Sequence, residues 1–245
     1  TVHADNKIVK RSSIMNEPLP NCAGCSIPFA ERFCRVERGK APKDCPSGHY
    51  RKLAQEIFAE TPAEEKEFMR QTMIQEAAGY LYRPEQKDVL PAKTRIEETI
   101  GFAKRMGYKK LGLVSCVAMH AELPIIKQIF EINGFEVISV ACKVGRQPKV
   151  SFGVKPEEFV NPGLCMENAC NPRLQAVLMN RAKVDFNILI GLCVGHDTVV
   201  FKHLDAPATV LIAKDRVLAH NPMGAVYMLE SSYAFLKKPL EPEQL

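Results

Sequence analysis

The second half of the chain alternates between short apolar runs and longer stretches with helical periodicity. An apolar run of this length, bounded by turn signals, is typical of a strand that is buried on both faces. Because helical stretches separate the runs, we expect parallel strands joined by crossover helices. The predicted strands cover residues 111–116, 135–142, 186–193 and 209–213.

Right-handed crossovers between these strands are compatible with the order 2-1-3-4, in which the first strand lies beside the third. The sequence therefore predicts an α/β protein with a Rossmann-like parallel sheet. Predicted helices cover residues 122–133, residues 171 to about 183, a short segment from Asp197, and a segment opened by Asn221-Pro222.

The first half of the chain has helical signals after a stretch without periodicity. A helix is expected at residues 49–60, and Thr61 and Thr94 each precede a glutamate by three residues, which is the capping-box pattern. The helices that they open should reach about Arg83 and Met106. The predicted organisation is a flexible leader (1–20), a four-cysteine metal- or cluster-binding module (21–47), a helical segment (48–93), a Rossmann-like α/β domain (94–236) and a tail (237–245).

The module at residues 21–47 contains four cysteines and has too few apolar residues to form a core. Cys22, Cys25, Cys34 and Cys45 follow the pattern C-x2-C-x8-C-x10-C. Two thiolates that are separated by two residues can bind one ion or one corner of a cluster. Four unrelated thiols in a loop are the alternative, but a segment without a core needs something else to hold it together. We therefore predict that these four cysteines bind a metal.

The kind of metal is less closely defined by the spacing. Zinc modules commonly use two C-x2-C pairs, whereas this segment has one. A proline after the last cysteine, as in Cys45-Pro46, is also found in ferredoxin ligand runs. These features favour an iron–sulfur cluster, of the 4Fe-4S type, with zinc as the alternative.

A second group of cysteines follows the predicted strands. Cys116, Cys142 and Cys193 each end a strand, and Cys170 precedes a helix in the loop between the second and third strands. Ligands of open parallel sheets bind at the carboxyl ends of the strands, so these thiols are expected to line a cofactor site. Any one of them alone is better explained as a buried core residue, because free cysteine is commonly buried, and the prediction depends on three strands that all end in cysteine.

His196 follows Cys193 on the same predicted edge, in the sequence GLCVGHD. A histidine at this place is a candidate ligand or proton donor, but it is equally well explained as a turn residue. The run Lys214-Asp215-Arg216 and His220 would add a polar rim, although a charged run at a strand end is usually solvated. Cys165, in the loop before Cys170, has no assigned role.

Composition and charge exclude several classes of protein. Nine cysteines without an export signal favour a reducing, cytoplasmic compartment. The net charge of +5 is spread along the chain with few aromatic residues beside it, which argues against nucleic-acid binding. No apolar run is long enough for a membrane helix. The sequence has neither G-x-G-x-x-G nor a P-loop, which argues against dinucleotide and nucleoside triphosphate binding.

The chain also resembles a known family of cysteine-rich proteins. The similar segments are Cys22 to Pro46, KRMGYKKLGLVSCV, NGFEVISVACKVG, Cys170-Asn171-Pro172, GLCVGHDTVVFKH and AKDRVLAHNP. They resemble the uncharacterised "metal-binding protein" family, a domain of unknown function found mainly in anaerobic bacteria and archaea. The resemblance spans about residues 20 to 230. It implies metal binding through the cysteines, with Cys116, Cys142, Cys170, Cys193 and His196 at motif positions, and it implies no particular reaction.

The sequence supports two candidate functions. The first is an iron–sulfur, redox-type protein with a four-cysteine site near the N-terminus and a second cysteine-lined site at the strand ends. The second is a zinc-binding, non-catalytic or sensor protein. A domain that binds a small molecule through a site without metal is a weaker third interpretation. A redox partner or a small-molecule substrate is expected in the first case, and the sequence leaves open the oligomeric state and whether the protein is an enzyme.

Overall fold

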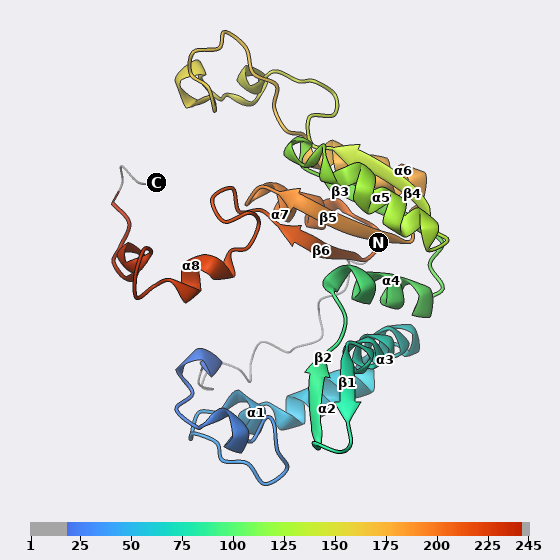
Figure 1. Ribbon diagram of the computed structural model, residues 1–245, viewed down its shortest axis with the longest axis vertical. Helices are drawn as coiled ribbons and strands as arrows, with labels where there is room; N and C mark the ends of the chain where they lie inside the picture. Colours follow the sequence, from blue (N-terminus) through green and yellow to red (C-terminus); the bar gives the residue numbers. More distant parts are fainter. Residues whose placement is uncertain (1–18, 242–245) are drawn as a thin grey trace. The chain divides into compact units, whose positions relative to one another are not determined.

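The computed structural model describes residues 19–241, and the chain forms two compact units with their boundary in the sequence between Met73 and Ile74 (Figure 1). The predicted leader lies outside the described residues except for Leu19 and Pro20, as does the end of the predicted tail from residue 242. Each unit is described below by itself.

The second unit is built on a parallel sheet. Within the described residues its strands are β3 (Lys110–Ser115), β4 (Glu136–Ala141), β5 (Phe186–Leu192) and β6 (Ala208–Ala213). Their order is β4-β3-β5-β6, and every neighbouring pair is parallel. This order is the predicted 2-1-3-4, so the Rossmann-like α/β fold is confirmed. Every residue of β5 is buried, as expected for a central strand that is covered on both faces.

Helices cover both faces of this sheet (Figure 1). Right-handed crossovers put α5 (Glu122–Ile132) on one face and α6 (Pro172–Ala182) with α7 (His196–His203) on the other, and α6 packs against α7. The helix α4 (Arg95–Arg105) precedes β3 and contacts β6. The core between these layers is apolar, and its fully buried side chains include Leu111, Leu113, Phe130, Met179, Ile188 and Ile190.

Local sequence signals set the ends of these helices. Thr94 and Glu97 form the predicted capping box, in which the Thr94 N–H donates to Glu97 Oε2 at 2.8 Å. Gly107, with φ of +71°, follows the end of α4, and Gly134, with φ of +90°, follows the end of α5. Both positions need the left-handed conformation that glycine adopts without strain.

The helix predicted after Thr61 begins within one residue of the expected place, but its capping box and its end at Arg83 are wrong. The helix α3 covers Ala63–Ala78, and the Thr61 hydroxyl donates to Ile57 O of the preceding helix at 2.7 Å instead of forming a capping box. After Gly79 the chain forms a hairpin of β1 (Tyr80–Arg83) and β2 (Asp88–Pro91). Tyrosine and leucine side chains favour a strand here, and an ion pair between Arg83 and Asp88 closes the hairpin.

The first unit has little tertiary packing. It contains α1 (Pro46–His49), α2 (Arg51–Glu60) and most of α3, and none of its described residues is buried. The segment before α1 is held by local hydrogen bonds and by a bridge between Arg32 and Lys40. A unit without buried side chains lacks the main stabilising contribution to folding.

The remaining secondary structure is short. The helix α8 (Met223–Tyr227) follows β6. No helix within residues 19–241 is long and apolar enough to cross a membrane. Single turns of 3₁₀ helix lie at Cys22–Gly24, Phe29–Glu31, Val117–Met119, Lys149–Phe152, Pro156–Glu158 and Ala234–Lys237.

Candidate functional site

A pocket of about 760 Å³ lies in the second unit, at the carboxyl ends of β3, β4 and β5. A cavity of this size is typical of a site for a small molecule or cofactor. All the residues that the sequence predicted for the second cysteine site line it, namely Cys116, Cys142, Cys170, Cys193 and His196. We refer to it below as the thiol pocket.

Three of the thiols are in contact through Cys142. Its Sγ lies 4.0 Å from the Sγ of Cys116 and 3.4 Å from the Sγ of Cys170. Cys116 and Cys142 directly follow β3 and β4, which are neighbours in the sheet, so their side chains emerge side by side. The Val117 N–H also donates to Cys142 Sγ, at 3.3 Å. Both cysteines are buried at the floor of the pocket.

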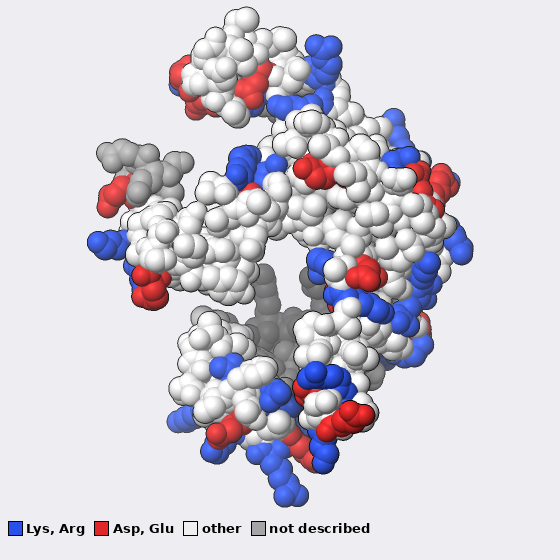
Figure 2. Space-filling model, in the orientation of Figure 1, with Lys and Arg blue, Asp and Glu red and all other residues white. Residues whose placement is uncertain are grey.

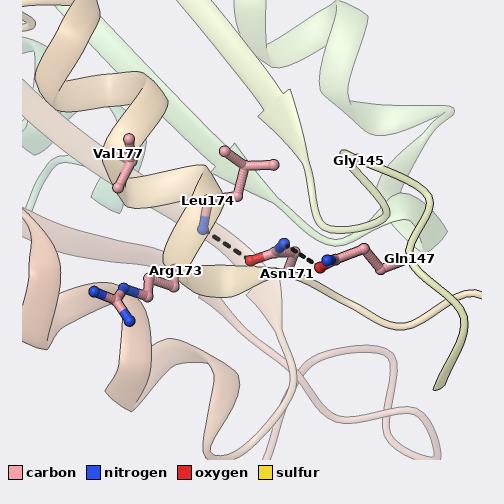
Figure 3. Close-up of a pocket in the computed structure, with 6 residues that line it drawn as sticks. All are labelled: Gly145, Gln147, Asn171, Arg173, Leu174 and Val177. Atoms are coloured by element: carbon pink, nitrogen blue, oxygen red, sulfur yellow. Dashed lines mark hydrogen bonds between the residues drawn. The ribbon is translucent and has the colours of Figure 1, made fainter. Parts of the chain in front are cut away.

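Cys170 is brought to this edge by the start of α6. Its neighbour Asn171 is the N-cap of that helix, with its side chain accepting from the Leu174 N–H at 2.9 Å. The same side chain donates to Gln147 Oε1, and the two hydrogen bonds are visible in Figure 3. The Asn171 N–H donates to Cys142 O at 2.8 Å, which fixes the loop over the end of β4.

Cys193 is positioned by an irregularity at the end of β5. The pairing of β5 with β6 shifts register between Ile190 and Leu192, and Gly191 between them has φ of +59°. A Cβ at Gly191 would also lie 2.9 Å from the side chain of Met119. The bulge therefore needs glycine for both its conformation and its space. Beyond it, Arg216 Nη2 donates to Cys193 Sγ at 3.0 Å.

His196 is the first residue of α7, and its backbone N–H donates to Cys193 O at 3.0 Å. Burial lowers the pKa of its imidazole below the usual value, which favours the neutral form. Its Nδ1 is buried and has no hydrogen-bond partner among the described residues. Gly195, rather than the predicted Asp197, is the N-cap of this helix, and the Asp197 carboxylate accepts from the Thr198 N–H at 2.8 Å.

The pKa values of the three contacting thiols differ. The hydrogen bond with Cys142, together with burial, raises the pKa of Cys116 to about 12. For Cys142 the contact with Cys116 lowers the pKa, but Cys170 and burial raise it, and the net shift is upward. The hydrogen bond with Cys142, aided by the charge of Lys143, lowers the pKa of Cys170 to about 7. In the absence of a metal, Cys170 is therefore the thiol most easily ionised of the three.

Gln175 supports the floor of the pocket from beneath and was not anticipated from the sequence. It is fully buried on α6, and its Nε2 donates to Ser115 O at 2.9 Å and to Val140 O at 3.1 Å. These carbonyl groups lie at the ends of the two strands that carry Cys116 and Cys142. A glutamine within the pattern of a helix gives no sequence signal for such a role.

The wall of the thiol pocket also carries charged side chains that the sequence analysis missed. Lys143 follows Cys142 directly, and Lys149 and Glu167 come from the long loop before α6. Lys214 and Arg216, which the sequence placed in a charged run after the last strand, reach the same pocket. The position of Lys143 at a strand end was the one available signal, whereas loop residues carry none.

The first cysteine group is in the first unit and is less closely assembled. Cys22 and Cys25 lie on one 3₁₀ turn, where the Cys25 N–H donates to Cys22 O at 3.3 Å. Cys22 and Cys34 are exposed, whereas Cys25 and Cys45 are half-buried. Within residues 19–241, the thiol pocket included, no group of three or more Cys, His, Asp or Glu side chains is arranged to hold a metal ion.

The donor set of both groups nevertheless fits a thiolate-ligated centre. All nine cysteines are free thiols, and four lie in each group. In the thiol pocket the sulfur separations of 3.4 and 4.0 Å bracket the distance of about 3.8 Å between two thiolates on one tetrahedral ion with bonds of about 2.3 Å. In the first unit, binding would have to organise the segment, because metal binding and folding are coupled where no preformed site exists.

Comparison with known proteins identifies relatives over most of the chain. Residues 45–211 match the family described as "Protein of unknown function (DUF1847)". The matched range contains the whole second cysteine group and Cys45 of the first. The chain is also similar to "Uncharacterized protein MJ0455" of the archaeon Methanocaldococcus jannaschii, with 39% identity over 199 residues, which is 81% of this chain and 92% of the relative. On both grounds the chain belongs to the DUF1847 family of proteins of unknown function.

Proposed function

We propose that this protein is a metal-binding, redox-type protein, one of whose two centres is held in the thiol pocket by Cys116, Cys142, Cys170 and Cys193. The supporting observation is the contact of Cys142 Sγ with the sulfur atoms of Cys116 and Cys170. Cys193 and His196 line the same pocket, so a fourth thiolate and an imidazole could also serve as ligands. Three thiols that meet from separate elements are more than a packed core requires.

A second centre is proposed at Cys22, Cys25, Cys34 and Cys45. None of the described residues of the first unit is buried, so apolar packing gives this unit little stability. A metal or cluster ligated by four thiolates would cross-link the segment and contribute folding free energy directly. The 3₁₀ turn that joins Cys22 to Cys25 has the short spacing of a pair of ligands to one centre.

Two kinds of metal are consistent with these residues. An iron–sulfur cluster, of the 4Fe-4S type, would supply one-electron redox chemistry, and four thiolates are its usual ligands. Zinc is the alternative, and the short sulfur separations in the thiol pocket favour a single ion there, because the thiolates of a cluster each bind a different iron. A zinc-binding, non-catalytic or sensor protein is therefore the second candidate function.

The free thiols and the surface charges bear on the compartment and the partners that we propose for this protein. Nine free cysteines favour a reducing compartment, which we take to be the cytoplasm. A redox partner or a small-molecule substrate is proposed for the thiol pocket. Nucleic acid and membranes are not among the proposed partners, because Lys and Arg side chains are interspersed with Asp and Glu over the face seen in Figure 2.

The test is the metal content of the full chain after anaerobic purification. Visible absorption and elemental analysis should find iron and sulfide if the redox-type proposal holds, and zinc with a colourless protein if the alternative holds. The Cys116→Ser/Cys193→Ser variant should lose the centre of the thiol pocket, and the Cys22→Ser/Cys25→Ser variant should lose that of the first unit.

Cys165→Ser is the matched control, because Cys165 is exposed and does not line the thiol pocket. It should keep the full metal content. A protein without bound metal, or a Cys116→Ser/Cys193→Ser variant with the metal content of the wild type, would overturn the proposal for the thiol pocket.

A further inference from the structure

Basic side chains dominate the charged lining of the thiol pocket. Among the described residues that line it, the cationic ones are Lys143, Lys149, Arg173, Lys214 and Arg216, and the one acidic one is Glu167. Such an excess concentrates positive potential in a cavity with partly apolar walls. Four thiolates around one divalent ion would carry two net negative charges, so the proposed centre would offset only part of this excess, because five cations and one carboxylate leave four net positive charges.

The single carboxylate pairs with two of the five cations and leaves one positive charge on that cluster. Glu167 Oε1 lies 3.1 Å from Lys149 Nζ and 3.9 Å from Lys143 Nζ, and Glu167 Oε2 accepts from the Val160 N–H at 2.9 Å. Glu167 and Lys149 are 15% and 18% exposed at their side chains, so this ion pair is largely shielded from water. These three residues therefore form a self-contained charged cluster.

Lys214 and Arg216, which follow β6 at the carboxyl edge of the sheet, have no such partner. No carboxylate in the described part of the chain lies within ion-pair distance of either side chain. Asp215, which separates them in sequence, accepts instead from the Val217 N–H at 3.0 Å and the Leu218 N–H at 2.8 Å. Arg216 reaches Cys193 Sγ, so its guanidinium group faces the thiols. Lys and Arg side chains are visible at this end of the sheet in Figure 2.

Much of the rest of the pocket wall is apolar. Val117, Phe152, Val154, Val160 and Val199 contribute side chains to it. Arg173, Lys214 and Arg216 line this cavity and are paired with no described carboxylate. A cavity of about 760 Å³ with apolar walls and such cations has room for an organic molecule as well as for a charged group. Arginine and lysine bind carboxylate and phosphate oxygens through charge-assisted hydrogen bonds.

We propose that the thiol pocket binds a small organic anion, whose carboxylate or phosphate group is held by Lys214 and Arg216 and whose apolar body lies against Val154 and Val160. This substrate class deepens the proposed function and rests on it, because it takes the thiol pocket as the working site. The anion would be bound beside Cys193, within the same cavity as the proposed metal ligands.

The test is isothermal titration calorimetry of the full chain, purified anaerobically, with four probes. Phenyl phosphate and phenylacetate carry both an apolar body and an anionic group. Benzyl alcohol lacks the charge, and inorganic phosphate lacks the body. At least one of the first two should bind about tenfold or more tightly than benzyl alcohol and inorganic phosphate, and the preferred one identifies the anionic group. Binding should weaken in about 0.5 M salt, because partly exposed charges are screened.

Charge-removing variants locate the site. Lys214→Gln and Arg216→Gln should each weaken binding of the preferred probe about tenfold. Lys202→Gln is the control, because Lys202 is exposed on α7 and does not line the pocket. Equal binding of benzyl alcohol and the anionic probes, or unchanged affinity in both variants, would overturn the proposal.

Metal content measured on the same samples separates this proposal from the proposed function. A protein without metal that still binds the anion through Lys214 and Arg216 retains the anion site and refutes the metal centre. A metal-loaded protein that binds no probe more tightly than benzyl alcohol refutes the anion site alone.

Discussion

The pKa of the Cys170 thiol is lower than the pKa values of Cys116 and Cys142 because of where Cys170 lies in the fold. Cys170 is half-buried at the start of α6, whereas Cys116 and Cys142 are buried at the ends of their strands. The Cys142 thiol hydrogen-bonds to it and Lys143 lies near it, and both lower its pKa. In metal-free protein this makes Cys170 the reactive member of the group, since the thiolate is the nucleophile.

The pH dependence of alkylation checks this assignment. A thiol with its pKa lowered to about 7 is ionised from neutral pH upward, so iodoacetamide should modify Cys170 of the metal-free protein with a half-maximal rate near pH 7. Peptide mass spectrometry measures the rate at each cysteine. Lys143→Gln should move the midpoint upward because it removes a charge that favours the thiolate. A midpoint for Cys170 at or above 9.0, the ordinary pKa, would contradict the assignment.

At the scale of elements, the site depends on how β5 ends. The register shift around Gly191 changes the direction of the chain just before Cys193, and Gly191 itself is in the left-handed region. Met119, from the 3₁₀ turn after β3, occupies the space that a side chain at Gly191 would need. The strand end is therefore tied to the neighbouring strand end by packing as well as by hydrogen bonds.

Replacing Gly191 by alanine should introduce both backbone strain in the left-handed region and a close contact with Met119. Gly191→Ala should lower the free energy of unfolding by about 2–3 kcal/mol, because left-handed strain adds to the contact with Met119. Denaturant titration followed by circular dichroism measures the change.

Gly153→Ala is a matched comparison for the strain alone. Gly153 has φ of +79°, and no atom lies within 4 Å of the site of its Cβ. Gly153→Ala should lower the free energy of unfolding by about 1 kcal/mol. If Gly191→Ala costs no more than Gly153→Ala, packing against Met119 does not constrain the bulge.

At the scale of the whole molecule, the two units differ in what can stabilise them. The sheet unit has a buried core of strand and helix side chains. The described part of the first unit has none, and its four cysteines are its distinctive feature. We infer that the sheet unit folds through apolar burial and that the first unit depends on a ligated centre.

Limited proteolysis tests this difference. Cys34→Ser should increase the rate of cleavage within residues 19–60 about tenfold, because the segment loses its cross-link and opens more often. The sheet unit should be cleaved at the wild-type rate in the same digestion, and mass spectrometry of the fragments separates the two. Unchanged cleavage of residues 19–60 would show that no centre at Cys34 holds the first unit.

The sequence by itself determined the sheet and the residues at its functional edge. Near-continuous apolar runs separated by helices predict a parallel sheet, and the order β4-β3-β5-β6, with which right-handed crossovers are compatible, is confirmed by the structure. Once that order holds, Cys116, Cys142 and Cys193 must meet at the carboxyl edge. The hairpin of β1 and β2 was not predicted, because a short strand pair after a long helix has only local propensity to indicate it.

Only the tertiary structure decided how the thiol pocket is built. The approach of Cys170 to Cys142, the support from Gln175, and the convergence of Lys143, Lys149, Lys214 and Arg216 all join residues from different elements. Periodicity reports which face of an element is buried, but it does not report which loops fold over a sheet edge. Those contacts depend on packing between distant segments, so they exist only once the chain has folded.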